Sequence, residues 1–457
     1  MANKSGDNRL FFIILALGIL VRLIVLFIPH VAFWDAAVYI GMGKYLFSNH
    51  QVGLWEDIRP IAWPAFLGLI WRLGLDPLVA GRIIDALISI SLIPLTFTLA
   101  KRVTTQKAAT VAAVFVAFSP MGVFFSSKVL TENVMTALML LSFILILSRK
   151  HAWWHDAFAG VCAALAFLVR WRIALMFIPL LAAVIVSSRK GWWRRMPIGG
   201  ATAFVTVTPY FLFNWFSYGS LFAPMTSLFS LIGSSGAYHP VSLTFYLRWF
   251  FWENPLYPLF IVGAVYAWRQ KNWVLVALAA VPILYFSFFS SLDHKELRYL
   301  FAAIPFVAIL VAHAMSRWRI SLTTLVGVLS AVMFCLAASY FIVQTGHKTF
   351  MPDPDVIQQV YGNDDVAGIV ASSGPQLAAY RDVDLRIVYW VEDYSYDLML
   401  RDDPDWIFWD TCQFMCVVPE CYDDLDDFMM RLLAENSIVF EKRGDLCSQF
   451  LLKRGKA

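Results

Sequence analysis

Ionisable side chains gather in a few short stretches of an otherwise apolar chain. Of its 457 residues, 60% are hydrophobic and 15% are charged. A charged side chain inside or beside an apolar span is unfavourable unless it is paired or hydrated, so such stretches are candidate functional sites. In chain order they are Asp35, Arg59, Arg82 with Asp85, Lys128 with Glu132, Arg170 with Arg172, and Asp293–Tyr299.

These side chains offer two complementary kinds of chemistry. A carboxylate such as Asp35 or Glu132 can act as a general base on a hydroxyl group. The cations can hold a phosphate, because Arg offers a planar fork and Lys a compact charge. Each type also has a structural interpretation: Asp35 caps a helix, and Lys or Arg near helix ends extends to lipid headgroups. The second interpretation does not explain why the cations occur in clusters with carboxylates.

Long apolar runs predict the helices that position these stretches. A bilayer requires roughly 20 apolar residues per helix, and the chain contains about eleven such runs. The expected spans lie near residues 10–28, 80–100, 108–125, 133–148, 157–170, 172–187, 197–216, 254–268, 273–290, 298–314 and 320–344.

Basic residues predict which side of the membrane each loop faces. If the N-terminus is cytoplasmic, every inner loop is short and contains Lys or Arg, as the positive-inside rule requires. An odd number of spans then places the C-terminus outside. We therefore expect a multi-pass protein of the plasma membrane with a cytoplasmic N-terminus, an extracytoplasmic C-terminal domain, and all the candidate stretches on the outer face.

Two long outer loops, at residues 29–79 and 217–253, are expected on the same face. The first contains Asp35, Arg59 and a short apolar run to Trp71, which fits an interfacial or re-entrant helix better than a span. Together the two loops can cover a cavity.

The composition changes near Gly346, which predicts a membrane domain over residues 1–345 and a small α/β domain over 346–457. The tail has no Gly-x-Gly-x-x-Gly sequence, so no nucleotide site is expected, nor a nucleic-acid partner. Its expected strands are Val366–Ala371, Leu385–Trp390, Trp406–Trp409 and Ser437–Glu441, and its expected helices are a short one ending at Tyr380 and Leu425–Glu435.

Cysteine and histidine usage favours disulfides over metal sites. Four cysteines lie in the tail, and in an oxidising compartment they predict two disulfides with three possible connectivities. A zinc site is the alternative, although the spacing matches no standard pattern. No His-Glu-x-x-His or paired-Asp motif is present, so no metal is expected elsewhere. The four cysteines are Cys412, Cys416, Cys421 and Cys447.

Three of the candidate stretches resemble motifs of the GT-C superfamily of membrane glycosyltransferases, which use polyprenyl- or dolichyl-phosphate sugars. Residues 33–35, Phe-Trp-Asp, are similar to the acidic motif after the first span of these enzymes. Residues 59–64 and the following apolar run look like the juxtamembrane helix of the protein O-mannosyltransferase and aminoarabinose transferase families. Residues 294–299 closely resemble the His-Lys-Glu-x-Arg-Phe motif of dolichyl-phosphate-mannose-dependent mannosyltransferases, with Tyr299 in place of Phe. The likeness covers residues 1–345.

The resemblance implies a role for each matched residue. Asp35 would be the catalytic base, with Trp34 beside it, and Glu132 would orient the acceptor or one of the cations. The lipid phosphate would be held by His294, Lys295 and Arg298, assisted by Arg59, Lys128, Arg170 and Arg172. Glu296 and Tyr299 would support these side chains or contact the acceptor.

Two departures from the family motifs restrict the expected acceptor and type of transfer. The Trp-Trp-Asp motif of oligosaccharyltransferases is absent, which argues against en bloc transfer to Asn and against the metal site of those enzymes. The first loop has Asp35 alone where protein O-mannosyltransferases carry an Asp-Glu pair, which argues against a protein acceptor.

These observations predict an α-helical polytopic membrane protein of the GT-C type with a small C-terminal α/β domain. The expected reaction is inverting transfer of a single sugar, with mannose expected, from a polyprenyl or dolichyl monophosphate to a hydroxyl of a glycan, lipid or protein outside the membrane. No cofactor is expected besides this lipid-linked donor. Two alternatives are a transporter or flippase of lipid-linked sugars, which needs charges along a path through the bilayer, and a non-catalytic membrane protein that binds glycan.

Overall fold

A computed structural model describes residues 4–149, 152–188, 191–234, 242–346, 354–388, 403–411, 420–443 and 448–455. The chain forms two compact units. The helical unit comprises Met1–Ile28, Arg82–Ala223 and Pro240–Gln344, and the sheet unit comprises Pro29–Gly81, Pro224–His239 and Thr345–Ala457. Each unit is described by itself.

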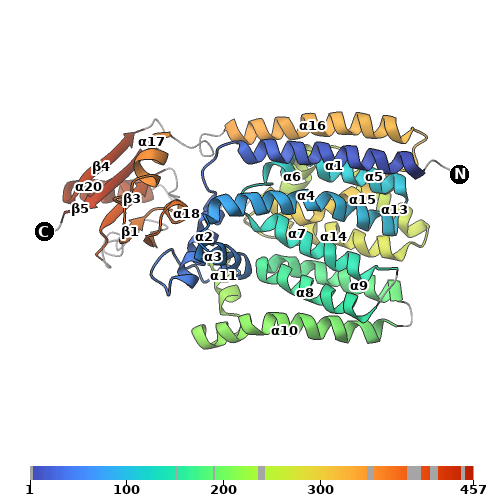
Figure 1. The fold of residues 1–457 in the computed structure, drawn as a ribbon, viewed down its shortest axis with the longest axis horizontal. Helices are drawn as coiled ribbons and strands as arrows, with labels where there is room; N and C mark the ends of the chain where they lie inside the picture. The colour runs from blue at the N-terminus through green and yellow to red at the C-terminus, as the bar shows by residue number, and fades with distance from the viewer. Residues whose placement is uncertain are drawn as a thin grey trace. The chain divides into compact units, whose positions relative to one another are not determined.

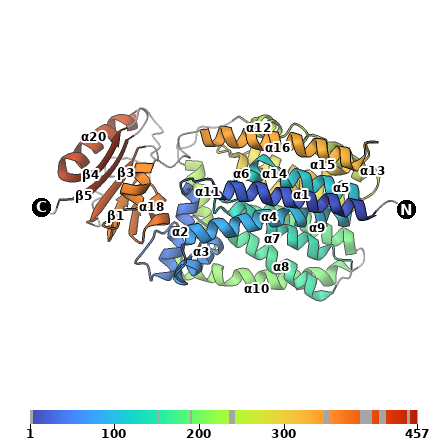
Figure 2. The same cartoon turned by 45° about the horizontal axis from the view of Figure 1, so that its top comes forward.

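Long apolar helices build the helical unit, and they run side by side in Figure 1 and Figure 2. The α-helices are α1 (Lys4–Phe27), α4 (Pro77–Val103), α5 (Gln106–Ala117), α6 (Pro120–Phe124), α7 (Thr131–Ile146), α8 (Trp153–Val169), α9 (Phe177–Ser188), α10 (Trp192–Tyr218), α12 (Phe245–Glu253), α13 (Leu259–Arg269), α14 (Trp273–Ser290), α15 (Ile304–Met315) and α16 (Leu322–Gly346). Helix α11 (Ala223–Ser234) follows α10 and belongs, after its first residue, to the sheet unit. Two 3₁₀ helices, η1 (Trp171–Met176) and η2 (Leu297–Ala303), lead directly into α9 and α15.

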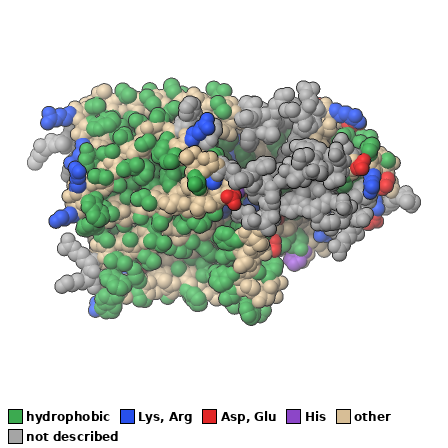
Figure 3. All heavy atoms as spheres, turned by 180° about the vertical axis from the view of Figure 1, so that it is seen from behind, with side chains coloured by type: hydrophobic (Ala, Val, Ile, Leu, Met, Phe, Trp, Pro, Cys, Tyr) green, Lys and Arg blue, Asp and Glu red, His purple; other side chains and the backbone are tan. Residues whose placement is uncertain are grey.

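The expected spans correspond to helices in the described part of the chain. Seven segments are long and apolar enough to cross a membrane, and four shorter apolar helices occupy the remaining expected positions. Hydrophobic side chains cover the flank of this unit, and Lys and Arg gather at its N-terminal end, on the left in Figure 3. The protein is therefore a multi-pass membrane protein.

One expected span differs, because residues 108–125 form two helices instead of one. Ser119 caps α6 by accepting a hydrogen bond from Gly122 N, and Pro120 occupies its first turn. Arg22 of α1 donates to the last carbonyls of α5, at 3.0 Å from Val116 O and 2.7 Å from Ala117 O. The last carbonyls of a helix have no donor within the helix, and at this break Arg22 is their donor.

The sheet unit combines the first loop with the C-terminal segment. It contains α2 (Trp34–Phe47), α3 (Ala62–Arg72), α17 (Pro354–Val356), η3 (Ile357–Tyr361), α18 (Gln376–Tyr380) and α20 (Glu420–Glu435). Its strands are β1 (Ile369–Ser372), β2 (Asp384–Ile387), β3 (Trp406–Asp410), β4 (Asn436–Arg443) and β5 (Ser448–Arg454), in the order β2-β1-β3-β5-β4.

The sheet is parallel at one side and antiparallel at the other. Strand β1 pairs in parallel with β2 and β3, and β5 pairs antiparallel with β3 and β4. The four expected strands and both expected helices are present with shifted ends, whereas β5 was not expected. In β5, Phe450, Leu451 and Leu452 form a continuous buried run. Such a run lacks the alternation of apolar and polar residues by which a half-buried strand is predicted.

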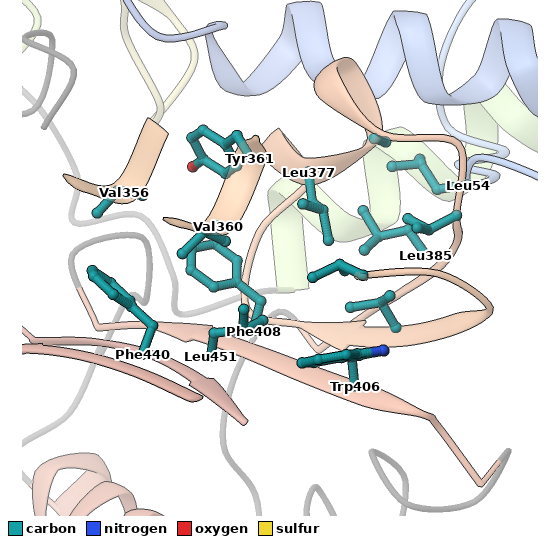
Figure 4. Close-up of a cluster of buried hydrophobic side chains, with 14 of the residues drawn as sticks. Leu54, Val356, Val360, Tyr361, Leu377, Leu385, Trp406, Phe408, Phe440 and Leu451 are labelled. Carbon is teal, nitrogen blue, oxygen red and sulfur yellow. The ribbon is translucent and has the colours of Figure 1, made fainter. Parts of the chain in front are cut away.

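The core of the sheet unit includes side chains from the first loop. Val38, Met42 and Leu54 are buried in one cluster with Leu377 and Leu385, residues more than 300 positions later in the chain. Figure 4 shows Leu54 beside Leu377 and Leu385. Gly53 has φ +96° and hydrogen-bonds with Val383 and Leu385, so the loop adds backbone pairing beside β2.

Candidate active site

The turn that precedes η2 is organised around one carboxylate. Glu296 accepts hydrogen bonds from Arg298 Nη2 at 3.1 Å and from Tyr299 Oη at 3.1 Å, and a further one from Arg298 Nε. His294 Nε2 lies 2.9 Å from Glu296 Oε1. The backbone carbonyl of Glu296 accepts from Tyr246 Oη of α12, which fixes the turn to a second helix. The predicted motif residues are therefore held together by Glu296.

A second ion pair adjoins this turn. Arg172 of η1 donates to Glu132 of α7 at 2.5 Å, and the Glu132 carboxylate is buried. The Arg172 guanidinium also lies over the Tyr299 ring, 4.6 Å from its centroid. Tyr299 thereby contacts both Arg172 and Glu296, so three turns that are distant in sequence meet at one place. The charges of Arg170 and Arg298 also act on Arg172.

The turn between α6 and α7 is held in an unusual conformation. Val129 has φ +58°, a left-handed value that is strained for a β-branched residue. Asp85 of α4 accepts from Val129 N at 2.9 Å and from Asn133 Nδ2 at 2.9 Å, which stabilises this conformation. Asp85 is fully buried. It therefore positions the turn that contains Lys128 and Glu132.

Lys128 is buried on this turn, with its ammonium group 5.2 Å from the centroid of the Phe124 ring. Burial, and then the nearby charge of Arg82, lower the pKa of Lys128 to about 7, against the opposing effect of Asp85. Lys128 is thus close to half-protonated at neutral pH. Lys295 is also buried, and its ammonium group donates to Leu292 O.

In the sheet unit, Asp35 belongs to a separate ion cluster. Arg59 Nη1 lies 2.8 Å from Asp35 Oδ1, and Arg59 Nε lies 2.7 Å from Glu56 Oε2. Both carboxylates are buried. Burial lowers the pKa of Arg59, but the charges of Asp35 and Glu56 outweigh it and raise that pKa well above its ordinary value. The Arg59 cation is therefore a fixed part of the cluster.

The cap interpretation of Asp35 is not what the structure presents. The N-cap residue of α2 is Phe33, and Asp35 is the second residue of the helix. Trp34 is partly buried against the hydrophobic cluster of the sheet unit. The same helix contains Lys44, whose ammonium group is 2.8 Å from Asp382 Oδ1, so α2 is also tied to the C-terminal segment by an ion pair.

Two sequence predictions fall on residues that the structure does not describe. Cys412, Cys416 and Cys447 lie outside the described residues, and only the backbone of Cys421 is described. Among the described residues, no group of three or more His, Cys, Asp or Glu side chains could hold a metal ion.

The structure brings several of the predicted residues together, and it adds three supporting residues that the sequence did not single out. Asp85 was noted only as a charge at the start of a span, although an Asp inside an apolar helix is itself a signal. Tyr246 gives no distinctive signal, because its contact is with Glu296, 50 positions later in the chain. The role of Glu56 depends on its side-chain pairing with Arg59.

Chemically, the site in the helical unit is suited to a phosphate. Its four cationic residues, Arg170, Arg172, Lys295 and Arg298, outnumber the carboxylates of Glu132 and Glu296 by two. This excess of positive charge suits an anionic group such as a phosphate. Charge-assisted hydrogen bonds from guanidinium groups are the strong contacts that phosphate recognition uses.

Comparison with known proteins supports the resemblance found in the sequence. The family model of the dolichyl-phosphate-mannose-protein mannosyltransferases matches residues 58–213. A comparison with curated proteins found no match.

Several solved structures share the fold. ArnT from Cupriavidus metallidurans bound to undecaprenyl phosphate is 13% identical, with a TM-score of 0.69 over 100% of this chain and 99% of that one. The oligosaccharyltransferase of Archaeoglobus fulgidus with a tethered acceptor peptide is 11% identical, with a TM-score of 0.57 over 99% and 74% of the two chains. The arabinofuranosyltransferase AftD from Mycobacteria is 13% identical, with a TM-score of 0.52 over 98% and 42%. The chain therefore has the fold of the GT-C membrane glycosyltransferases, with a small C-terminal sheet domain.

Proposed function

We propose that the protein is an inverting glycosyltransferase that moves a single sugar from a polyprenyl or dolichyl monophosphate to an acceptor hydroxyl at the outer membrane face, with mannose as the sugar. The observation that carries this proposal is the Glu296 carboxylate, which gathers His294, Arg298 and Tyr299 beside the Arg172–Glu132 ion pair. A cationic cluster in the turns between membrane helices suits a lipid-linked phosphate. The dolichyl-phosphate-mannose in the name of the matched family and the undecaprenyl phosphate bound to ArnT agree with this class of ligand.

In the proposed reaction, the acceptor oxygen forms a bond to the anomeric carbon while its proton passes to the Asp35 carboxylate. The bond from the anomeric carbon to the phosphate oxygen breaks, and the lipid phosphate leaves with the electron pair. Attack opposite the leaving group inverts the configuration. Arg298, Lys295 and His294 stabilise the charge that grows on the leaving phosphate.

The supporting residues have distinct parts in this proposal. Arg59 holds the Asp35 carboxylate in one orientation through the 2.8 Å ion pair. Glu132 orients Arg172, and Glu296 orients Arg298, so each phosphate-binding guanidinium is held before the donor arrives. Preorganised charges of this kind need no rearrangement during the reaction.

Replacing the proposed base tests the chemistry. Asp35→Asn should lower the transfer rate at least about 100-fold, the range for loss of a general base, because an amide cannot accept the proton. Donor binding and expression should change little. Sugar transfer to acceptor is measured by mass spectrometry with a panel of lipid-phosphate sugars, which also identifies the sugar.

The matched control is Asp57→Asn, in the same loop and outside the Arg59 cluster. It should keep the rate of the unmodified protein. Equal rates for Asp35→Asn and the unmodified protein would remove Asp35 from the mechanism.

Replacing a proposed phosphate ligand tests donor binding separately. Arg298→Ala should weaken the affinity for a polyprenyl phosphate by roughly 10- to 100-fold, since hydrogen bonds to charged groups contribute about 1.5–3 kcal/mol. Affinity is measured with purified protein by titration with a fluorescent polyprenyl phosphate. Arg248→Ala, an exposed position on α12, is the control. Unchanged donor affinity in Arg298→Ala would contradict the assignment.

A further inference from the structure

An apolar groove lies between α8, α9 and α10 of the helical unit. Its volume is about 390 Å³, and Gly160, Ala163, Gly200 and Ala203 are among the small residues that line it. Helices α8 and α10 lie side by side in Figure 1 and Figure 2. Leu181 of α9 and Phe204 of α10 also line the groove and are exposed, so it opens on the flank that the bilayer surrounds.

The groove cannot close by tighter helix packing. Helices α8 and α10 already meet at their backbones, because a Cβ atom added to Gly160 would lie 2.1 Å from Gly199 O. Thr202 Oγ1 of α10 donates to Ala157 O of α8 at 2.8 Å. At one end of the groove, Arg195 Nη2 and Asp156 Oδ1 form an ion pair at 3.0 Å. These contacts hold α8 against α10, and Arg195 Nη1 also donates to Ser188 Oγ of α9 at 2.5 Å. All three helices are therefore linked at this end, and the groove beyond it is open to a chain from the bilayer.

The length of the groove matches the depth of the hydrocarbon in one leaflet of the bilayer. Along α8 it extends from Asp156 to Phe167, which at the rise of an α-helix is about 16 Å. The hydrocarbon of one leaflet is about 15 Å deep, half of the bilayer core. Phe167 packs near Phe177 and Phe211 at the far end, with ring centroids 6.3 and 6.4 Å away. A chain that enters from the side of Arg170 and Arg172 would meet these rings first.

The other end of the groove is suited to an anionic headgroup. Arg195 lines it, but its guanidinium already donates to Asp156, Ser188 Oγ and Ile146 O. The exposed charge at this end is that of Arg194, which lies over the Trp193 ring at 4.6 Å from the centroid. Arg149 is exposed three residues after Ile146, which also lines the groove. Exposed Trp153 and Trp193 near this end are the residue type found at headgroup level. Clustered Arg side chains beside a membrane attract anionic lipids.

We propose that this groove is a binding site for one acyl chain of an anionic glycerophospholipid, with its headgroup at the end where Arg149 and Arg194 are exposed. The lipid comes from the leaflet next to the basic loops, and it is distinct from the polyprenyl donor. Its role is to fill the gap between α9 and α10. The site is independent of the proposed catalytic function.

Photochemical labelling of the full-length protein tests this site. The protein is placed in phosphatidylcholine nanodiscs that contain a phosphatidylglycerol with a diazirine in its acyl chain, and adducts are located by peptide mass spectrometry. Parallel samples contain the same chain on phosphatidylcholine, or a diazirine-bearing polyprenyl phosphate. We expect the phosphatidylglycerol probe to label the groove-lining segments of α8 and α10 more strongly than either other probe.

Two glycine substitutions make the test specific. An added Cβ atom meets nothing within 4 Å at Gly200 in the groove or at Gly327 on α16, so neither substitution clashes with the fold. Gly200→Leu should lower labelling of the groove about tenfold, because its side chain occupies the space of several methylene groups. Gly327→Leu should leave it unchanged. Equal groove labelling in both variants, or stronger labelling by the polyprenyl probe, would overturn the proposal.

Discussion

At the residue scale, two carboxylates in the helical unit do most of the positioning. Glu296 binds a His, an Arg and a Tyr of its own turn, and Glu132 binds Arg172 of another turn. Tyr299 connects the two, because its hydroxyl donates to Glu296 while its ring lies beneath Arg172. A buried polar network of this kind fixes each cation in one orientation, which an isolated exposed Arg would not have.

Lys128 gives a prediction at the same scale, in the pH dependence of donor binding. Its pKa is lowered to about 7, chiefly by burial. Only the protonated form attracts a phosphate, so if Lys128 contacts the donor, its contribution to the affinity is full below about pH 6, is half lost near pH 7 and is lost at higher pH. Lys128→Arg should remove this dependence, since Arg stays protonated.

The measurement is a donor titration between pH 6 and pH 9, which extends from about one unit below this pKa to about two units above it. Lys101→Arg, an exposed position at the end of α4, is the matched substitution and should keep the dependence of the unmodified protein. A flat profile for the unmodified protein would exclude Lys128 from phosphate binding.

At the element scale, the break between α5 and α6 determines where the turn of Lys128 and Glu132 begins. Arg22 donates to the carbonyls at the C-terminus of α5, and Glu253 of α12 accepts a hydrogen bond from Met121 N at the N-terminus of α6. A cation at a helix C-terminus complements the helix dipole. Glu253 acts here as a hydrogen-bond acceptor, and burial raises its pKa to about 8. Arg22 is fully buried, and it also donates to Ser89 Oγ of α4.

Arg22→Met should therefore destabilise the protein by about 3 kcal/mol or more, because two buried carbonyls lose their donor. The thermal unfolding temperature in detergent measures this effect. Arg269→Met removes an exposed Arg from the end of α13 and should change stability by less than about 0.5 kcal/mol. Similar unfolding temperatures for the two variants would show that the Arg22 contacts do not stabilise the break.

At the scale of the whole molecule, the first loop and the C-terminal segment fold as one unit. Leu54 is buried against Leu377 and Leu385, Ala32 N donates to Tyr380 Oη at 2.9 Å, and Lys44 pairs with Asp382. Helix α2, which contains Asp35, is thus supported by residues of the C-terminal segment. A role for that segment follows: it stabilises the loop that holds the proposed base.

Leu54→Ala tests this dependence. The substitution should cost about 2–4 kcal/mol, the range for a buried Leu, and should make both residues 29–81 and the C-terminal strands easier to cleave. Limited proteolysis with mass spectrometry measures both segments together. Leu73→Ala, at a Leu that is 70% exposed, should change neither. Faster cleavage of the first loop alone would show that the two segments are independent.

The sequence by itself determined the membrane helices and offered candidates for the residues of the site. Apolar runs predicted their positions because a bilayer requires a minimum length of hydrophobic helix. The stretch at residues 294–299 predicted a cationic turn, and the GT-C resemblance predicted the fold. These features are local, so periodicity and motif spacing are enough to find them.

Only the tertiary structure decided how these residues are partnered. The pairing of Glu132 with Arg172, the contact of Asp85 with Val129 and the ion pair of Asp35 with Arg59 each join separate turns. Packing of Leu54 against Leu377 joins segments more than 300 residues apart. Such contacts depend on which faces the folded helices and strands bring together, and a residue pattern within one segment contains no information about its distant partner.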